Sequence, residues 1–347
     1  MTSKFNLDPD QKNAVEYDGN KPLLIEAGPG AGKTRVMIER IKYLINEKGI
    51  DPESLLVITF SNKSAEELLA RLMDSEDGLD SHIVNKMQVS TIHSFCYSLL
   101  RDHENSFLEI LGDDLGEKND LFIRKHMRDL GFVEEAYISK RDIGMIINKF
   151  DEYTTFKVDI DKLIDYIEDK FPPVPEYVEL IAKLKKEAEE NDESFSFPRE
   201  EIKDDDKLKS GYHNARFLAI AKAYKIYQNF LKEENTIDFA FIQRNALDLL
   251  ENNPELARNL KYKNILVDEF QDTDPVQMKI FDLLINNENL ESFTVVGDDD
   301  QSIYAFRGSD IEFFTKFEET YDADCCSLNT NYRSANTIVD FNENYKG

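Results

Sequence analysis

Ala27-Gly28-Pro29-Gly30-Ala31-Gly32-Lys33-Thr34 lies between an apolar run, residues 23–25, and a segment with apolar residues at helical spacing, residues 36–45. A strand, a glycine-rich loop and a helix in this order wrap backbone N–H groups around a phosphate and direct a helix N-terminus at it. The stretch therefore predicts a binding site for a nucleoside triphosphate.

Two side chains of this loop have specific expected roles. Lys33 would reach the outer phosphates, and the Thr34 hydroxyl would complete the coordination shell of Mg²⁺. A dinucleotide site is excluded because a third glycine is missing at the required offset and Lys-Thr is the wrong ending. A glycine-rich turn without a ligand is disfavoured by the flanking strand and helix. The residues expected to contact the nucleotide are Ala27, Gly28, Pro29, Gly30, Ala31, Gly32, Lys33, Thr34 and Arg35.

Length and composition predict a globular chain with two compact units. The 347 residues are 41% hydrophobic and 32% charged, and no apolar run is long enough to span a bilayer. The N-terminus lacks the basic and apolar parts of a signal peptide. Cys96, Cys325 and Cys326 have no metal-ligand spacing and suit a reducing compartment, so we expect a cytoplasmic location without a membrane partner.

The net charge of −27 argues against a protein that coats nucleic acid by bulk electrostatic attraction. It is compatible with a local groove that binds a single strand through stacking and a few basic residues.

Five apolar segments are predicted strands, and each ends in a polar cluster. They are residues 23–25, 55–58, 87–89, 264–267 and 293–296. Ligands bind beyond the carboxyl ends of the strands in an open parallel sheet. We therefore expect one α/β sheet, with all five clusters at the same edge.

The remainder of the chain is predicted to be mostly helical. Asp8 and Pro9 indicate a helix start near the N-terminus, with Asp8 as the N-cap. Strand–helix alternation stops between about 105 and 211, where charged helical segments and polar linkers predict an inserted helical subdomain. The predicted organisation is a split α/β domain, 1–104 and 212–330, around this insertion, with 331–347 as a hinge.

Paired acids follow the strand at 264–267. Asp268 is placed to bind the Mg²⁺ that bridges the outer phosphates, and Glu269 is placed to polarise the attacking water. Two adjacent carboxylates could also cap a turn, but a phosphate loop in the same chain disfavours that interpretation. Gln301 follows the next strand, where its amide could sense the terminal phosphate.

Aromatic residues lie beside polar and basic groups at several strand ends. Stacking a base on an exposed ring contributes about 1–3 kcal/mol and tolerates any base sequence, which suits a single strand of nucleic acid better than a duplex. The alternative, that these rings belong to the core, is strongest for Phe95. The candidate residues for contact with a single strand are Phe60, Asn62, Lys63, His93, Tyr304, Phe306 and Arg307.

The ordered set of motifs resembles the N-terminal motor part of the UvrD/Rep/PcrA helicases of superfamily one. Asp268-Glu269-Phe270-Gln271-Asp272 and the segment Gly297–Gly308 are the most discriminating motifs. The other matching segments are Leu7–Gln11, Ala27–Thr34, Thr59–Lys63, Ser90–Ser94 and Asn331–Ser334. The resemblance implies a RecA-like P-loop fold, ATP and Mg²⁺ as cofactors, and an accessory helical domain that touches duplex DNA.

The resemblance also implies residue roles at matched positions. Gln11 would hydrogen-bond the adenine and Tyr332 would stack on it, whereas Arg333 and Gln301 would contact the terminal phosphate. Phe60, Asn62, His93, Tyr304, Phe306 and Arg307 would lie along single-stranded DNA or couple it to the nucleotide. The family usually has Trp where Phe306 stands, so stacking there would cover less area.

The family's second motor domain has no counterpart among these 347 residues. We expect a part of a longer protein that binds ATP weakly, hydrolyses it slowly and does not unwind DNA alone. The leading hypothesis is the ATP-binding half of an ATP-dependent 3′–5′ DNA helicase acting on single strands and junctions. The alternatives are a subunit of a helicase–nuclease and a non-catalytic, nucleotide-switched regulator.

Overall fold

The computed structural model describes residues 7–74, 78–104, 109–111, 122–132, 138, 140–301 and 309–334. Within these ranges the chain divides into two compact units, Met1–Asn105 with Asn245–Gly347, and Ser106–Arg244. Each unit has its own hydrophobic core. No described helix combines the length and apolarity that crossing a bilayer requires.

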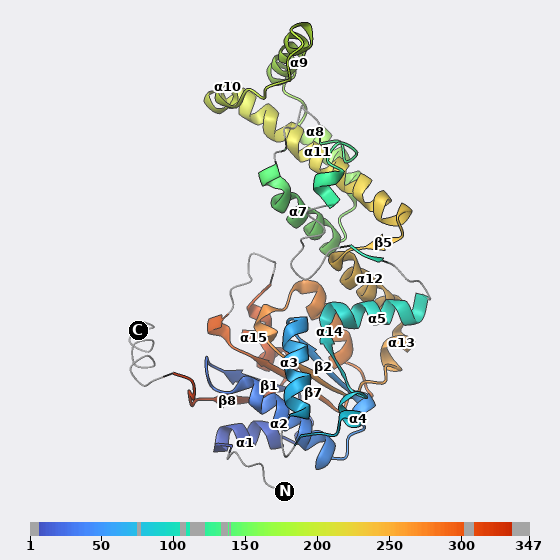
Figure 1. Cartoon of the computed structure of the whole chain (residues 1–347), viewed down its shortest axis with the longest axis vertical. Helices are drawn as coiled ribbons and strands as arrows, with labels where there is room; N and C mark the ends of the chain where they lie inside the picture. The colour runs from blue at the N-terminus through green and yellow to red at the C-terminus, as the bar shows by residue number, and fades with distance from the viewer. Residues whose placement is uncertain are drawn as a thin grey trace. The chain divides into compact units, whose positions relative to one another are not determined.

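The first unit is built on a six-stranded parallel sheet with the order β3-β2-β6-β7-β1-β8. Figure 1 labels β2, β7, β1 and β8 of this sheet. Its strands are β1 Leu23–Ala27, β2 Leu55–Thr59, β3 Gln88–Thr91, β6 Asn264–Val267, β7 Ser292–Gly297 and β8 Asp324–Leu328. The five strands predicted from the sequence all lie in this one sheet. The α/β fold with a parallel sheet is therefore confirmed, and β8 is an additional edge strand.

Helices cover both faces of this sheet. They are α1 Pro9–Glu16, α2 Lys33–Asn46, α3 Asn62–Met73, α4 Ser81–Val84, α5 Ile92–Glu104, α13 Pro254–Arg258, α14 Pro275–Ile285, α15 Glu312–Thr315 and α16 Phe317–Tyr321. Two neighbouring residues of β7 contact helices on the two faces of the sheet. Phe293 packs against Phe281 of α14 and Phe317 of α16, whereas Thr294 contacts Arg40 of α2. Successive strand side chains point to opposite faces, so α2 and α14 lie on opposite sides of the sheet.

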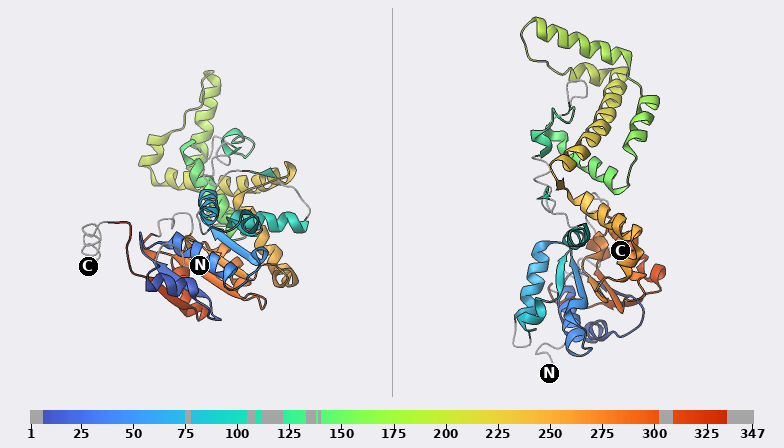
Figure 2. Two further views of the ribbon diagram at one scale, coloured as in Figure 1. Left: turned by 60° about the horizontal axis from the view of Figure 1, so that its bottom comes forward. Right: turned by 90° about the vertical axis from the view of Figure 1, so that its right-hand side faces the viewer.

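The second unit is mostly helical, as predicted for the insertion. It comprises β4 Glu109–Ile110, α7 Ile143–Thr155, α8 Ile160–Lys170, α9 Pro175–Glu190, α10 Arg199–Asp204, α11 Asp206–Glu233 and β5 Thr236–Ile237. Figure 2 shows α11 as the long helix against which α8 and α9 pack. The chain passes into the first unit within α12, Phe239–Asn252.

The second unit ends later than the sequence indicated. The predicted boundary at 211–212 falls inside α11, which is continuous from Asp206 to Glu233. Ile220, Tyr224 and Tyr227 of that helix are buried in the core of the second unit. The charged run before 211 resembles a linker in composition, but it forms the first turns of a helix whose later turns are apolar on one side.

Two carboxyl groups lie close together inside the second unit. Asp238 is buried and accepts hydrogen bonds from the Tyr227 hydroxyl, at 2.7 Å, and from the backbone N–H of Phe241, at 2.8 Å. Asp151 of α7 is partly buried nearby, and burial together with the charge of Asp238 raises the pKa of Asp151 to about 7. Asp151 is therefore held in a site that favours its neutral form.

We expect Asp151→Asn to stabilise the chain at pH 8 and to change its stability little at pH 4. An unfolded Asp has a pKa near 4, so between pH 4 and about 7 the folded chain holds a proton that the unfolded chain has released. The contribution of Asp151 to the free energy of unfolding is thus at its maximum below pH 4, and it is lost as the pH rises to about 7. Removing the charge should raise the free energy of unfolding at pH 8 by about 1–3 kcal/mol. Urea unfolding across this pH range, with exposed Asp161→Asn as the control, measures the difference.

Candidate nucleotide-binding site

The loop between β1 and α2 has a backbone that favours glycine at two positions. Gly30 and Gly32 have φ values of +80° and +89°, a region that side-chain-bearing residues rarely adopt. Gly32 is the N-cap of α2, which begins at Lys33, and no side chain in the described part of the chain caps that helix. Thr34 and Arg35 follow in its first turn. The first N–H groups of a helix have no partners within the helix and form the positive end of its dipole, so the N-terminus of α2 suits an anion.

Lys33 lies in a cluster of carboxylates. Its Nζ is 3.6 Å from Glu269 Oε2 and 3.7 Å from Asp298 Oδ2. These distances exceed a hydrogen bond, and among the described residues this buried Nζ has no hydrogen-bond partner. The phosphate loop and the paired acids, more than 200 residues apart in sequence, meet at one edge of the sheet, as the parallel arrangement predicted. A buried ammonium group without hydrogen bonds is suited to receive an anionic oxygen.

Asp268 and Glu269 directly follow β6. Asp268 accepts a hydrogen bond from the backbone N–H of Glu269 at 3.0 Å, and burial followed by the charge of Glu269 raises the pKa of Asp268 to about 7. Glu269 has a left-handed φ of +50°, and its Oε2 accepts from Gln271 Nε2 at 2.9 Å. Acids packed this closely favour a bound cation, because a cation would stabilise their ionised forms.

Two acids that were not selected from the sequence belong to this cluster. Asp298 is 3% exposed and directly follows β7; burial raises its pKa, against the opposing effect of Lys33. Asp272 has a buried Oδ1 without a hydrogen-bond partner among the described residues, and burial followed by the charge of Glu269 raises its pKa to about 6. Asp298 was detectable by the rule that selected Asp268, because it too follows a buried strand directly.

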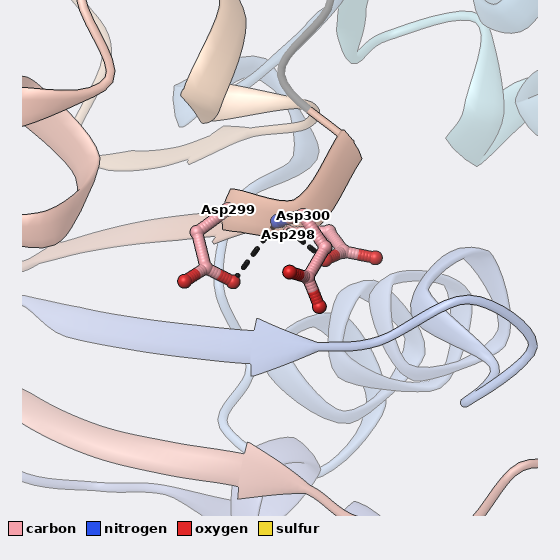
Figure 3. Close-up of side chains that lie close together, drawn as sticks. All are labelled: Asp298, Asp299 and Asp300. Carbon is pink, nitrogen blue, oxygen red and sulfur yellow. Dashed lines mark hydrogen bonds between the residues drawn. The ribbon is translucent and has the colours of Figure 1, made fainter. Parts of the chain in front are cut away.

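Three consecutive acids after β7 are drawn in Figure 3. The backbone N–H of Asp300 donates to the carboxylates of Asp298, at 3.2 Å, and Asp299, at 3.0 Å. These hydrogen bonds account for the turn, and Asp299 and Asp300 are exposed. Gln301 lies in the same turn and donates from Nε2 to Asp298. Gln301 therefore contacts the carboxylate that faces Lys33.

Gln11 connects α1 to the phosphate loop. Asp8 is the N-cap of α1 and forms the predicted helix start with Pro9, and Gln11 completes a capping box with it. Gln11 is 1% exposed, and its Nε2 donates to the carbonyl of Ala31 at 3.1 Å. The amide of Gln11 carries two hydrogens, and Ala31 accepts from one of them.

The segment 331–334 lies directly on the phosphate loop. Asn331 Nδ2 donates to the Pro29 carbonyl at 2.8 Å, and the Tyr332 N–H donates to the Gly30 carbonyl at 2.9 Å. The Tyr332 ring is 57% exposed, and its hydroxyl donates to Asp8 at 2.6 Å. Arg333 lies beside the loop, because a Cβ on Gly30 would be 2.8 Å from Arg333 Cβ. Asn331 is a further residue that sequence reasoning did not assign.

The candidate DNA-contacting residues occupy the ends of β2 and β3. Phe60 follows β2 and is 41% exposed, and Asn62 and Lys63 begin α3. His93 lies in the first turn of α5, where burial lowers its pKa to about 4, so it is neutral at pH 7. Phe95 is buried and packs edge-on against Tyr262, in agreement with a core role. Tyr304, Phe306 and Arg307 lie outside the described residues.

Comparison with known proteins identifies the same family along nearly the whole chain. A family model described as the UvrD/REP helicase N-terminal domain matches residues 7–322. A probable DNA helicase II homolog of Mycoplasma capricolum is 30% identical over 339 residues, which are 97% of this chain and 40% of that protein.

Two further relatives agree with this match. An ATP-dependent DNA helicase PcrA of Staphylococcus epidermidis is 31% identical over 96% of this chain and 39% of its own length. A putative ATP-dependent DNA helicase YjcD of Bacillus subtilis is 32% identical over 96% and 37%. The chain thus spans about two fifths of the length of these relatives. It belongs to the UvrD/REP helicase N-terminal domain family.

Proposed function

We propose that this chain is the ATP-binding part of an ATP-dependent DNA helicase that moves 3′ to 5′ along single-stranded DNA and unwinds duplexes. The observation that carries the proposal is the position of Lys33. Its buried ammonium group lies within 4 Å of Glu269 and Asp298, at the N-terminus of α2, and has no hydrogen-bond partner among the described residues. The names of the relatives support the same activity.

The residues present fit ATP and Mg²⁺. The N-terminus of α2 and Lys33 would bind the phosphates, and Thr34 and Asp268 would hold the metal. Gln11 and Tyr332 would bind the adenine, and Arg333 and Gln301 would contact the terminal phosphate. Mg²⁺, when bound, neutralises charge on the phosphate oxygens.

Glu269 is the proposed general base. Its carboxylate is next to Lys33, and the hydrogen bond from Gln271 holds it in a defined orientation. From that position Glu269 would orient the attacking water and accept its proton. Gln301, which donates to Asp298, would link loss of the terminal phosphate to a change in the turn after β7.

Single-stranded DNA is the proposed partner at the ends of β2 and β3. The exposed ring of Phe60 suits stacking on a base, and neutral His93 suits hydrogen bonding without bulk charge attraction. Asn62, Lys63, Tyr304, Phe306 and Arg307 would complete the contact, and the second unit would contact the duplex beyond it. This mode of binding is compatible with the net charge of −27.

The 347-residue chain should bind ATP with Mg²⁺ but hydrolyse it slowly, and it should not unwind duplex DNA. The relatives are more than twice as long, and we assign a second motor domain to the part of their length that this chain does not match. Calorimetry with ATP, a phosphate-release assay with and without single-stranded DNA, and unwinding of 3′- and 5′-tailed duplexes test this. Absence of ATP binding would exclude the site, and strong DNA-stimulated hydrolysis by this chain would exclude the need for a second domain. A full-length protein that binds ATP without any turnover would support the regulator instead.

A further inference from the structure

Arg40 is a fully buried charge outside the phosphate-binding loop. It lies on α2, two turns after Lys33, and is 1% exposed. The described acceptors of its hydrogen bonds are all uncharged. Burial lowers its pKa to about 10, so it remains protonated at neutral pH. A charge buried in this way is retained only where its hydrogen bonds are well satisfied.

The partners of Arg40 are the end of α1 and the centre of the sheet. Its Nη1 donates to the carbonyls of Ala14 at 3.1 Å, Val15 at 3.2 Å and Tyr17 at 3.1 Å. Its Nε donates to Thr294 Oγ1 on β7 at 3.1 Å. The last carbonyls of a helix have no partners within the helix and form the negative end of its dipole. Arg40 therefore holds the C-terminal end of α1 against the sheet.

The opposite end of α1 carries Gln11, which we propose binds the adenine, and Asp8, which contacts Tyr332. Gln11 donates to Ala31 of the phosphate loop, and Asp8 accepts from Tyr332. Ala14 and Val15 are about one helical turn from Gln11, so a shift of their carbonyls moves Gln11 as well. A helix of eight residues is not stable by itself and takes its position from such contacts.

Tyr17 extends the same connection to the edge of the sheet. Its carbonyl accepts from Arg40, its ring centroid is 5.8 Å from the guanidinium carbon, and its hydroxyl donates to Asp324 of β8 at 2.6 Å. The chain continues from β8 to Tyr332. Both segments that flank the expected adenine position are thus connected to Arg40.

We propose that Arg40 is a positioning residue for base recognition, which sets α1 so that Gln11 faces the adenine at a fixed distance from the phosphate loop. The inference rests on the proposed ATP site and adds to it a residue that touches no part of the nucleotide. The phosphate contacts expected of Lys33 and of the α2 N-terminus come from α2 itself, whereas α1 meets the phosphate loop through Gln11 and Ala31. Arg40 should therefore control affinity for the base and leave affinity for the phosphates unchanged.

The test compares ATP, GTP and inorganic tripolyphosphate, each with Mg²⁺, binding to the 347-residue chain by calorimetry. In Arg40→Met we expect the dissociation constant for ATP to rise about tenfold, and the preference for ATP over GTP to fall by a similar factor. Binding of tripolyphosphate should change less than twofold. Arg40→Lys should recover part of the ATP affinity, because an ammonium group can still reach α1 carbonyls but cannot also span to β7.

Two further variants keep the result interpretable. Thr294→Val removes only the β7 contact of Arg40 and should leave ATP affinity within about threefold of wild type. In a double-mutant cycle, adding Arg40→Lys to Gln11→Ala should cost no further ATP affinity, because Arg40 acts through Gln11. If Arg40→Met does not fold, Arg40→Lys and this cycle carry the test.

Equal losses of ATP and tripolyphosphate affinity, an unchanged ATP-to-GTP ratio, or additive effects in the cycle would each overturn the proposal. A wild-type chain that binds tripolyphosphate but shows no preference among bases would also overturn it. If wild type binds none of the three ligands, the proposed function fails, and the assignment of Arg40 fails with it.

Discussion

Glu269→Gln is expected to lower ATP turnover by about 10²–10⁴-fold in the full-length protein with single-stranded DNA present. The amide is the same size as the carboxylate and retains an oxygen that can accept from Gln271. The amide cannot accept a proton from water, and the substitution removes one negative charge beside Lys33. Phosphate release measures turnover, and calorimetry with the 347-residue chain measures ATP binding.

The same variant should bind ATP as tightly as wild type or more tightly. The triphosphate carries negative charge into a cluster that already holds Asp268, Glu269 and Asp298, so neutralising one acid reduces repulsion. Glu291→Gln is the matched control, because Glu291 is exposed, pairs with Lys263 and precedes β7 at the opposite edge of the sheet. Unchanged turnover in Glu269→Gln would remove Glu269 from its proposed role.

Lys33→Ala is expected to abolish measurable ATP binding and also to destabilise the chain at pH 8. The variant removes the ammonium group that lies between Glu269 and Asp298. The side chain of Asp298 is only 2% exposed. Removing one partner from buried charges leaves the others uncompensated, at a cost of up to about 3–5 kcal/mol. We expect about 2–3 kcal/mol here, because the 3.6–3.7 Å separations are longer than direct hydrogen bonds.

The pH dependence separates this explanation from a simple loss of packing. At pH 5 the carboxyl groups of Lys33→Ala can take up protons, so the variant should recover part of its stability relative to wild type. Lys316→Ala removes an exposed i,i+4 ion pair with Glu312, which water screens, so its stability should stay close to that of wild type at either pH. A loss of stability in Lys33→Ala that is equal at pH 5 and pH 8 would contradict the electrostatic explanation.

Local sequence patterns predicted most of the first unit. Short apolar runs followed by polar clusters gave five strands of the sheet, and Asp8 with Pro9 gave the start of α1. The edge strand β8 was missed because its residues Asp324–Leu328 are mostly exposed and show no apolar run. The boundary at 211–212 was misplaced for a related reason, since composition alone does not distinguish a charged first turn of a helix from a linker.

The sequence by itself determined the phosphate-binding loop, the α/β class and the identity of the acids, because these depend on residue types at short spacing along the chain. Only the tertiary structure decided which distant groups share a position. The meeting of Lys33 with Asp298, the docking of Asn331 on Pro29 and the burial of Arg40 beneath α1 depend on the strand order β3-β2-β6-β7-β1-β8. That order results from the packing of whole helices on both faces of the sheet, which no short segment of the chain specifies.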